Sequence, residues 1–159
     1  TKRGTSLCHL FLGLAISMAP AGGWVAVTGS ISVPLLVLCT AVALWIGAFD
    51  AVYGSQDEAF DRSQGLHSLA TRFTARGALR LTRWLHAGSI LLFLLLGQLL
   101  GLGWLYYVGV GIAAGTLVYQ HSIVRADDYS RVTQQYFMRN GIVSIAMFLF
   151  TWASLSLNK

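Results

Sequence analysis

The stretch that decides the fold is Val33-Pro-Leu-Leu-Val-Leu-Cys-Thr-Ala-Val-Ala-Leu-Trp-Ile-Gly-Ala-Phe49, which contains no charged side chain. It belongs to an uncharged run that covers residues 4–49. Two further runs of this kind cover 84–124 and 140–158, with histidine counted as neutral. A helix needs about 20 apolar residues to cross a membrane, since each residue adds about 1.5 Å and the hydrocarbon layer is about 30 Å thick. The sequence therefore predicts an all-α fold, a polytopic transmembrane helix bundle.

The composition agrees with a membrane protein and excludes an ordinary soluble domain. Hydrophobic residues make up 55% of the chain and charged residues only 11%, whereas soluble domains carry about a quarter charged residues. The formal net charge of +5 would suit a nucleic-acid partner, but the basic residues lie in short segments that flank the apolar runs. We therefore predict the lipid bilayer as a partner and exclude nucleic acid.

The three uncharged runs are long enough for five spanning helices, two in each of the first two runs and one in the third. Cys8 and Cys39 fall inside these spans and are expected to be buried thiols without a disulfide. We expect the first span to stop near Pro20 and the stretch 51–65 to be helical. The chain begins at Thr1 without an initiator Met, so we expect a fragment of a longer protein. The predicted spans cover 5–18, 33–50, 83–100, 104–121 and 140–157.

The charges also predict how the bundle lies in the membrane. Ten of the eleven Lys and Arg residues precede the first span or lie between the second and third or the fourth and fifth. Only Lys159 lies on the other side. By the positive-inside rule, the side with the ten basic residues is cytoplasmic. All six acidic residues lie on that same side, so carboxylate chemistry is expected at the cytoplasmic face.

The acidic segment after the second span has a helical spacing. Asp50, Tyr53, Asp57, Asp61 and Gln64 follow one another at intervals of 3, 4, 4 and 3 residues, which places them on one face of a helix. Like charges one turn apart destabilise a helix by a few tenths of a kcal/mol, but two convergent carboxylates suit Mg²⁺, which substrate phosphates then complete. The alternative is a set of ordinary interfacial acids on a solvated loop. Asp50 favours a functional role, because it ends an otherwise uncharged span, where an acid is costly.

These residues also carry a family resemblance. The pattern Asp50-x-x-Tyr53-x-x-Gln56-Asp57-x-x-x-Asp61-Arg62 resembles the second aspartate-rich motif of the UbiA prenyltransferase superfamily. The resemblance covers essentially the whole chain. Further stretches that resemble its 4-hydroxybenzoate polyprenyltransferase-like branch are 2–5, 20–24, 65–73, 120–128 and 137–144.

The resemblance implies a bundle of roughly nine helices, with aspartate-rich motifs after the second and sixth. Matched in that way, residues 1–159 form a partial domain that supplies the last five helices. The first motif, of the form N-D-x-x-D-x-x-x-D, is absent from this sequence. The resemblance therefore implies half of an active site, and we expect the chain to be inactive by itself.

The chemistry implied by the resemblance is transfer of a polyprenyl group from polyprenyl diphosphate to an aromatic acid acceptor such as 4-hydroxybenzoate, in ubiquinone or menaquinone biosynthesis. Asp57 and Asp61 then hold Mg²⁺ against the diphosphate, where the metal charge stabilises the leaving group. Asp50 and Tyr53 then orient the acceptor or assist its proton loss. The resemblance also implies a multi-pass protein of the bacterial inner membrane with cytoplasmic active-site loops.

The basic residues near the motif are the candidates for substrate binding. Arg3 matches a family residue that meets the acceptor carboxylate or the diphosphate, and Lys2 lies beside it. We expect Lys2, Arg3 and Tyr53 to face one cavity with the two predicted metal ligands. His67 follows the motif and is a candidate for contact with the diphosphate. Arg72 begins a basic helical face that either draws in the diphosphate or anchors the chain to anionic lipid; the other members of the face are Arg76, Arg80 and Arg83.

Other polar residues have simpler interpretations. His86 and His121 lie near span ends and are expected to make structural hydrogen bonds. Asp127 and Asp128 are expected to cap the last cytoplasmic loop. The alternative functions are a transporter or channel fragment, which should carry ionisable residues near mid-span, and a small structural subunit, which leaves the acidic face unexplained. The aromatic residues expected in an outer interfacial belt are Trp104, Tyr106 and Tyr107.

Overall fold

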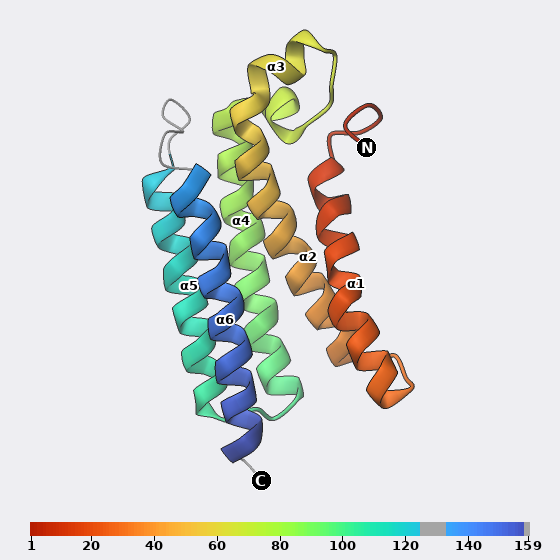
Figure 1. Cartoon of the computed structure of the whole chain (residues 1–159), viewed down its shortest axis with the longest axis vertical. Coiled ribbons are helices and arrows are strands. Elements are labelled where there is room, and N and C mark those ends of the chain that lie inside the picture. Colours follow the sequence, from red (N-terminus) through yellow and green to blue (C-terminus); the bar gives the residue numbers. More distant parts are fainter. Residues whose placement is uncertain (125–132, 158–159) are drawn as a thin grey trace.

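The computed structural model describes residues 1–124 and 133–157, and within those ranges every regular element is a helix (Figure 1). Five long helices run alternately up and down, so the chain starts at one end of the bundle and α6 finishes at the other (Figure 1). The predicted fold class is confirmed. The elements are α1 (Cys8–Thr28), α2 (Val33–Gly54), the 3₁₀ turn η1 (Ser55–Asp57), α3 (Glu58–Ser63), α4 (Leu69–Leu99), α5 (Trp104–Ile123) and α6 (Thr133–Leu157).

Four of the long helices of the described chain are long and apolar enough to cross a membrane, and α5 is the exception. Three glycines dilute the hydropathy of α5, and Gln120 and His121 make its last turn polar. Its length of 20 residues still matches the hydrocarbon layer. The five predicted long helices are therefore present, although one is less apolar than the others.

Three predicted boundaries are wrong, and one of them is the start of the last helix, which begins at Thr133 rather than at 140. The first helix does not stop near Pro20 but continues to Thr28, where Gly29 adopts a left-handed conformation with φ 66° and its N–H bonds to the Val25 carbonyl. Inside a bilayer no water replaces a lost backbone hydrogen bond, so a helix continues through proline. The third long helix begins at Leu69 rather than at 83, because its arginine-rich first turns form a helical extension beyond the uncharged run. The expectation of helix across 51–65 agrees with the end of α2, η1 and α3.

Small residues let the first two helices approach closely. A Cβ atom at Gly13 would overlap the carbonyl oxygen of Ala43 and lie 2.9 Å from the Gly47 nitrogen. Close backbone approach at such small residues is the usual way in which membrane helices associate. Packing of α1 against α2 therefore depends on the absence of side chains at this contact.

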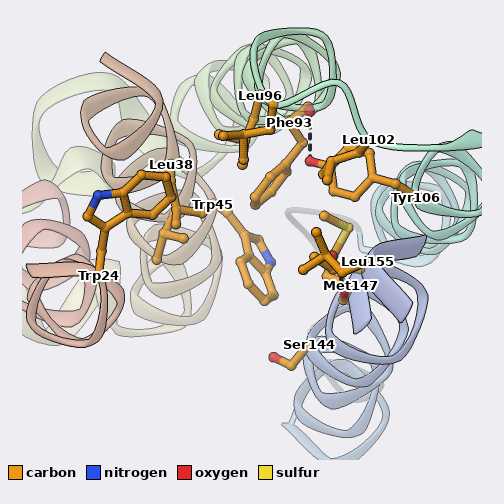
Figure 2. A pocket seen from close by; sticks show the side chains of 13 residues that line it. Trp24, Leu38, Trp45, Phe93, Leu96, Leu102, Tyr106, Ser144, Met147 and Leu155 are labelled. Carbon is orange, nitrogen blue, oxygen red and sulfur yellow. Dashed lines mark hydrogen bonds between the residues drawn. The ribbon is translucent and has the colours of Figure 1, made fainter. Parts of the chain in front are cut away.

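The main apolar core joins α2, α4, α5 and α6. Trp45 and Phe93 meet edge to face with ring centroids 6.5 Å apart, and the Tyr106 hydroxyl donates to the Phe93 carbonyl at 2.7 Å. These side chains border a cavity of about 480 Å³ that Met147 and Leu155 of α6 also line (Figure 2). The cavity wall is almost wholly apolar, so this half of the bundle contrasts with the charged end described next.

Candidate active site

The acidic segment that runs from the end of α2 through α3 lies at the end of the bundle that also holds the N-terminus (Figure 1). The helix does not run evenly through them, because α2 ends at Gly54, η1 tightens the chain and α3 starts at Glu58. As a result, Asp61 is buried with 1% of its surface exposed, whereas Tyr53 is 42% exposed and Asp57 is also exposed. The predicted acidic face is thus divided between the interior and the surface.

Lys2 pairs with the buried member of this group. Its Nζ lies 3.0 Å from Asp61 Oδ2 and 3.2 Å from Oδ1. Burial by itself lowers the pKa of the Lys2 ammonium, but the hydrogen bond and charge of Asp61, together with the charge of Asp57, raise it above its ordinary value. Lys2 is therefore firmly cationic, and both predicted metal ligands act on it.

Backbone hydrogen bonds fix the N-terminal segment against the loop between α3 and α4. The His67 N–H donates to the Lys2 carbonyl at 2.6 Å, and the Leu66 N–H donates to the Asp61 carbonyl at 2.8 Å. The Cys8 thiol also lies 3.7 Å from the His67 carbonyl. This strap of residues 2–8 brings Lys2 and His67, two of the predicted substrate-binding residues, into direct contact through their backbones.

Asp50 has a partner that the sequence analysis missed. His9 Nδ1 lies 2.6 Å from Asp50 Oδ2, and because a carboxylate only accepts, the imidazole N–H is the donor. His9 is 2% exposed, and Gly54 leaves room for its ring, since a Cβ there would lie 2.7 Å from His9 Cε1. The two residues lie on different helices, so no local spacing reveals the pair. The available signal was a histidine near the start of the first predicted span, at the same level in the membrane as the acid that ends the second span.

Glu58 organises the start of α4. Its Oε1 accepts from Arg62 Nε and Nη2 at 3.0 and 2.9 Å, while its Oε2 accepts the backbone N–H of Ala75 at 2.7 Å. That N–H is available because Thr74 interrupts the helix with φ 63° and ψ 163°. Glu58 therefore caps the second segment of α4 and ties it to α3, a role that no sequence pattern indicated.

A basic hollow of about 390 Å³ opens beside the strap. His67 and Arg72, both predicted to bind substrate, line it together with Arg62. Arg72 also lies over the Phe73 ring, with its guanidinium carbon 5.3 Å from the ring centroid. Arg3 is exposed and does not line this hollow. Two guanidinium groups and an imidazole make the hollow suitable for an anionic group.

The donor chemistry of this end fits a hard cation only with help from a ligand. Within residues 1–124 and 133–157, no group of three or more His, Cys, Asp or Glu side chains is placed to hold a metal. Asp57 and Asp61 offer the carboxylate oxygens that Mg²⁺ prefers, and Mg²⁺ commonly takes its other ligands from water and substrate phosphates. A shared metal site at these two acids stays a prediction, because Asp57 is exposed whereas Asp61 is buried and paired with Lys2. Asp127 and Asp128, predicted to cap a loop, lie outside the described residues.

A multi-pass bundle with carboxylates and cations gathered at one end has the architecture of a membrane protein that handles a charged group beside the hydrocarbon layer. The family model of the UbiA prenyltransferase family matches residues 1–152. The chain belongs to that family.

Similar proteins agree with this assignment. The chain is 35% identical over 146 residues to a 4-hydroxybenzoate octaprenyltransferase of Vibrio cholerae. The matched region covers 92% of this chain and 51% of the relative. It is 30% identical over 148 residues to a 4-hydroxybenzoate octaprenyltransferase of Escherichia coli, covering 93% of this chain and 50% of the relative. The apo structure of a UbiA homolog from Aeropyrum pernix K1 superposes with a TM-score of 0.76 at 26% identity, covering 99% of this chain and 57% of that one. The chain thus spans about half the length of the curated relatives it matches.

Proposed function

We propose that this chain supplies one half of the active site of an aromatic prenyltransferase. The reaction transfers a polyprenyl group from polyprenyl diphosphate to an aromatic acid such as 4-hydroxybenzoate, in ubiquinone or menaquinone biosynthesis. The observation that carries the proposal is the Lys2–Asp61 pair at 3.0 Å, with Asp57 close enough for its charge to act on the same ammonium. Family membership and the names of the relatives support it.

The leaving diphosphate is handled by acids and cations together. Asp57 and Asp61 would hold a divalent metal, for which we propose Mg²⁺, and the metal when bound would supply positive charge to the departing diphosphate. Lys2 orients the Asp61 carboxylate, and its positive charge offsets the negative charges of Asp61 and Asp57. The basic hollow with His67 and Arg72 draws the diphosphate towards this end of the bundle.

In this proposal, residues nearer the hydrocarbon layer bind the aromatic acceptor and remove its proton. The hydrogen bond from His9 fixes the Asp50 carboxylate, which orients the acceptor and takes up the proton that the aromatic ring loses. Tyr53 lies one turn further along α2 and orients the acceptor with it. Arg3 binds the acceptor carboxylate. A transporter function has less support, because the described acids lie at one end of the bundle and not at mid-span.

The test pairs this chain with the N-terminal half of the Vibrio cholerae relative and follows a radiolabelled prenyl diphosphate joined to an aromatic acid. The double variant Asp57→Ala, Asp61→Ala should lose turnover by about 1000-fold or more, because charge stabilisation of the leaving group is removed. The chain alone should show little turnover. Membrane insertion and helical content serve as folding controls, and unchanged turnover in the double variant refutes the proposal.

The same assay tests the proposed location. The basic charge of this end supports a cytoplasmic orientation in the bacterial inner membrane. Inner-membrane vesicles turned inside out should therefore use added substrate, whereas right-side-out vesicles should not. The opposite result contradicts the orientation and leaves the chemistry intact.

A further inference from the structure

A second groove lies between α4 and α5, away from the residues assigned to prenyl transfer. It has a volume of about 480 Å³, which is within the usual range for small-ligand sites. Its polar members are Arg83 and His86 of α4 and His121 of α5, and its apolar wall includes Ile90, Leu117 and Val118. Among the residues that line it there is no acid.

The polar and apolar members lie at different depths. α4 descends from the charged end and α5 returns to it (Figure 1). At 1.5 Å per residue, Arg83 and His121 both lie about 25 Å above the far ends of their helices, so they share one level near the charged end. Ile90 lies about 10 Å deeper along α4. The groove is therefore apolar almost throughout, and Arg83, the one cationic side chain among the described residues that line it, lies at the end nearest the charged face.

A short chain of hydrogen bonds holds the histidine at the head of the groove. The carbonyl oxygen of Trp45 can only accept, so His86 Nε2–H is the donor at 3.3 Å. The Nδ1 atom of a neutral His86 is then an acceptor, and His121 Nε2–H donates to it at 2.8 Å. His86 is 2% exposed, which makes this support rigid. The remaining ring nitrogen of His121, Nδ1, is then an acceptor and cannot donate to a phosphate oxygen, so Arg83 is the group left to meet an anion.

We propose that this groove binds one anionic phospholipid. Its headgroup phosphate lies against Arg83, and one acyl chain follows the wall formed by Ile90, Leu117 and Val118. Basic pockets between helices at the charged face of a membrane protein are suited to anionic lipid headgroups. The apolar wall favours a lipid over a free phosphate ion as the ligand. An inorganic ion would leave most of this apolar surface uncovered.

The experiment uses the whole chain reconstituted in bilayer discs of phosphatidylcholine with about one fifth phosphatidylglycerol. Native mass spectrometry then counts the lipids that stay bound to the released protein. The parent chain should retain one phosphatidylglycerol in preference to phosphatidylcholine. Arg83→Gln should reduce this preference about fivefold.

Arg80→Gln is the matched control, because Arg80 is an exposed residue one turn away on α4 that lines a different hollow. It removes the same charge and should change the preference less than twofold. An unchanged preference in Arg83→Gln, or an equal fall in Arg80→Gln, overturns the proposal, since the lipid would then respond only to general surface charge.

Two further arms separate a lipid site from an anion site. Ala87→Phe fills the groove, which Ala87 lines, without changing any charge, and it should abolish the retained phosphatidylglycerol. Excess inorganic phosphate should not displace the lipid from the parent chain. Retention in Ala87→Phe, or displacement by phosphate, contradicts an acyl chain in the groove. Circular dichroism confirms folding of each variant, and Arg83→Gln alone decides the matter where another variant fails to fold.

Discussion

The charged end of the bundle and the apolar half opposite are held together in different ways. At the charged end, ionisable side chains from distant parts of the chain form the links, as in the pairs Lys2–Asp61 and His9–Asp50. Each of these bonds depends on two particular groups in one geometry. A single substitution there changes the chemistry of the site while most of the fold stays in place.

The apolar half depends on shape. A Cβ atom at Gly97 would lie 2.6 Å from Cε1 of Tyr106, and the hydrogen bonds of this half use neutral groups, such as the Ser154 hydroxyl that accepts from the Gly103 N–H at 2.9 Å. A charged side chain in hydrocarbon carries a large free-energy penalty. Close packing of neutral side chains therefore takes the place of ion pairs in this half. The comparison teaches that specific links between ionisable side chains and close apolar packing are concentrated at opposite ends of this molecule.

The largest effect is expected from a substitution in the apolar half. A Cβ atom at Gly109 would lie 2.6 Å from the Phe150 Cβ, whereas at Gly111 it would meet nothing within 4 Å. Gly109→Val should lower the free energy of unfolding by about 3 kcal/mol more than Gly111→Val, because both share the same change in helix propensity and only one overpacks α6. Chemical denaturation in detergent measures the difference, and equal stabilities contradict packing by shape.

A smaller effect is expected at the charged end. Asp50→Ala leaves the buried His9 N–H without its acceptor, so the free energy of unfolding should fall by about 2 kcal/mol. Asp50→Asn keeps an acceptor oxygen and should cost about half as much. The same denaturation experiment compares them. Equal losses would mean that the hydrogen bond has no specific role, and the contrast between the two ends would weaken.

The smallest effect has the opposite sign. Thr74 has φ 63° and ψ 163°, a region that is essentially confined to glycine and costs other residues about 1–3 kcal/mol. Thr74→Gly should therefore raise the free energy of unfolding by about 1 kcal/mol, after the entropy that glycine adds to the unfolded chain. Thr74→Ala keeps the Cβ atom and should show no such gain. A gain in both variants excludes backbone strain as its cause.

Much of the fold was predictable because it follows from charge placement alone. Uncharged runs predicted five long helices, and the ionisable residues predicted which ends of those helices meet. The errors at Pro20, Leu69 and Thr133 have a common cause. Lack of charge locates the hydrocarbon layer, but a helix ends where its backbone finds other partners, and in this chain that occurs outside the layer.

Less of the candidate site was predictable, because its links join separate helices. The family motif indicated Asp57 and Asp61 as metal ligands, which stays a prediction. Nothing local indicated that His9 meets Asp50, that Glu58 caps the chain at Ala75, or that two histidines expected to make structural hydrogen bonds make one with each other. Such pairs depend on how neighbouring helices align, and helical spacing within one segment carries no information about that alignment.

The strap formed by residues 2–8 also sets an order of events during biosynthesis. Lys2 precedes Asp61 by 59 residues, and a ribosome adds about 5–20 residues per second. About 3–12 s therefore pass between the synthesis of Lys2 and the synthesis of its partner Asp61. His67, which closes the strap on the Lys2 carbonyl, comes later still. The first residues of the chain consequently reach their final positions only after the first two helices and α3 have been made.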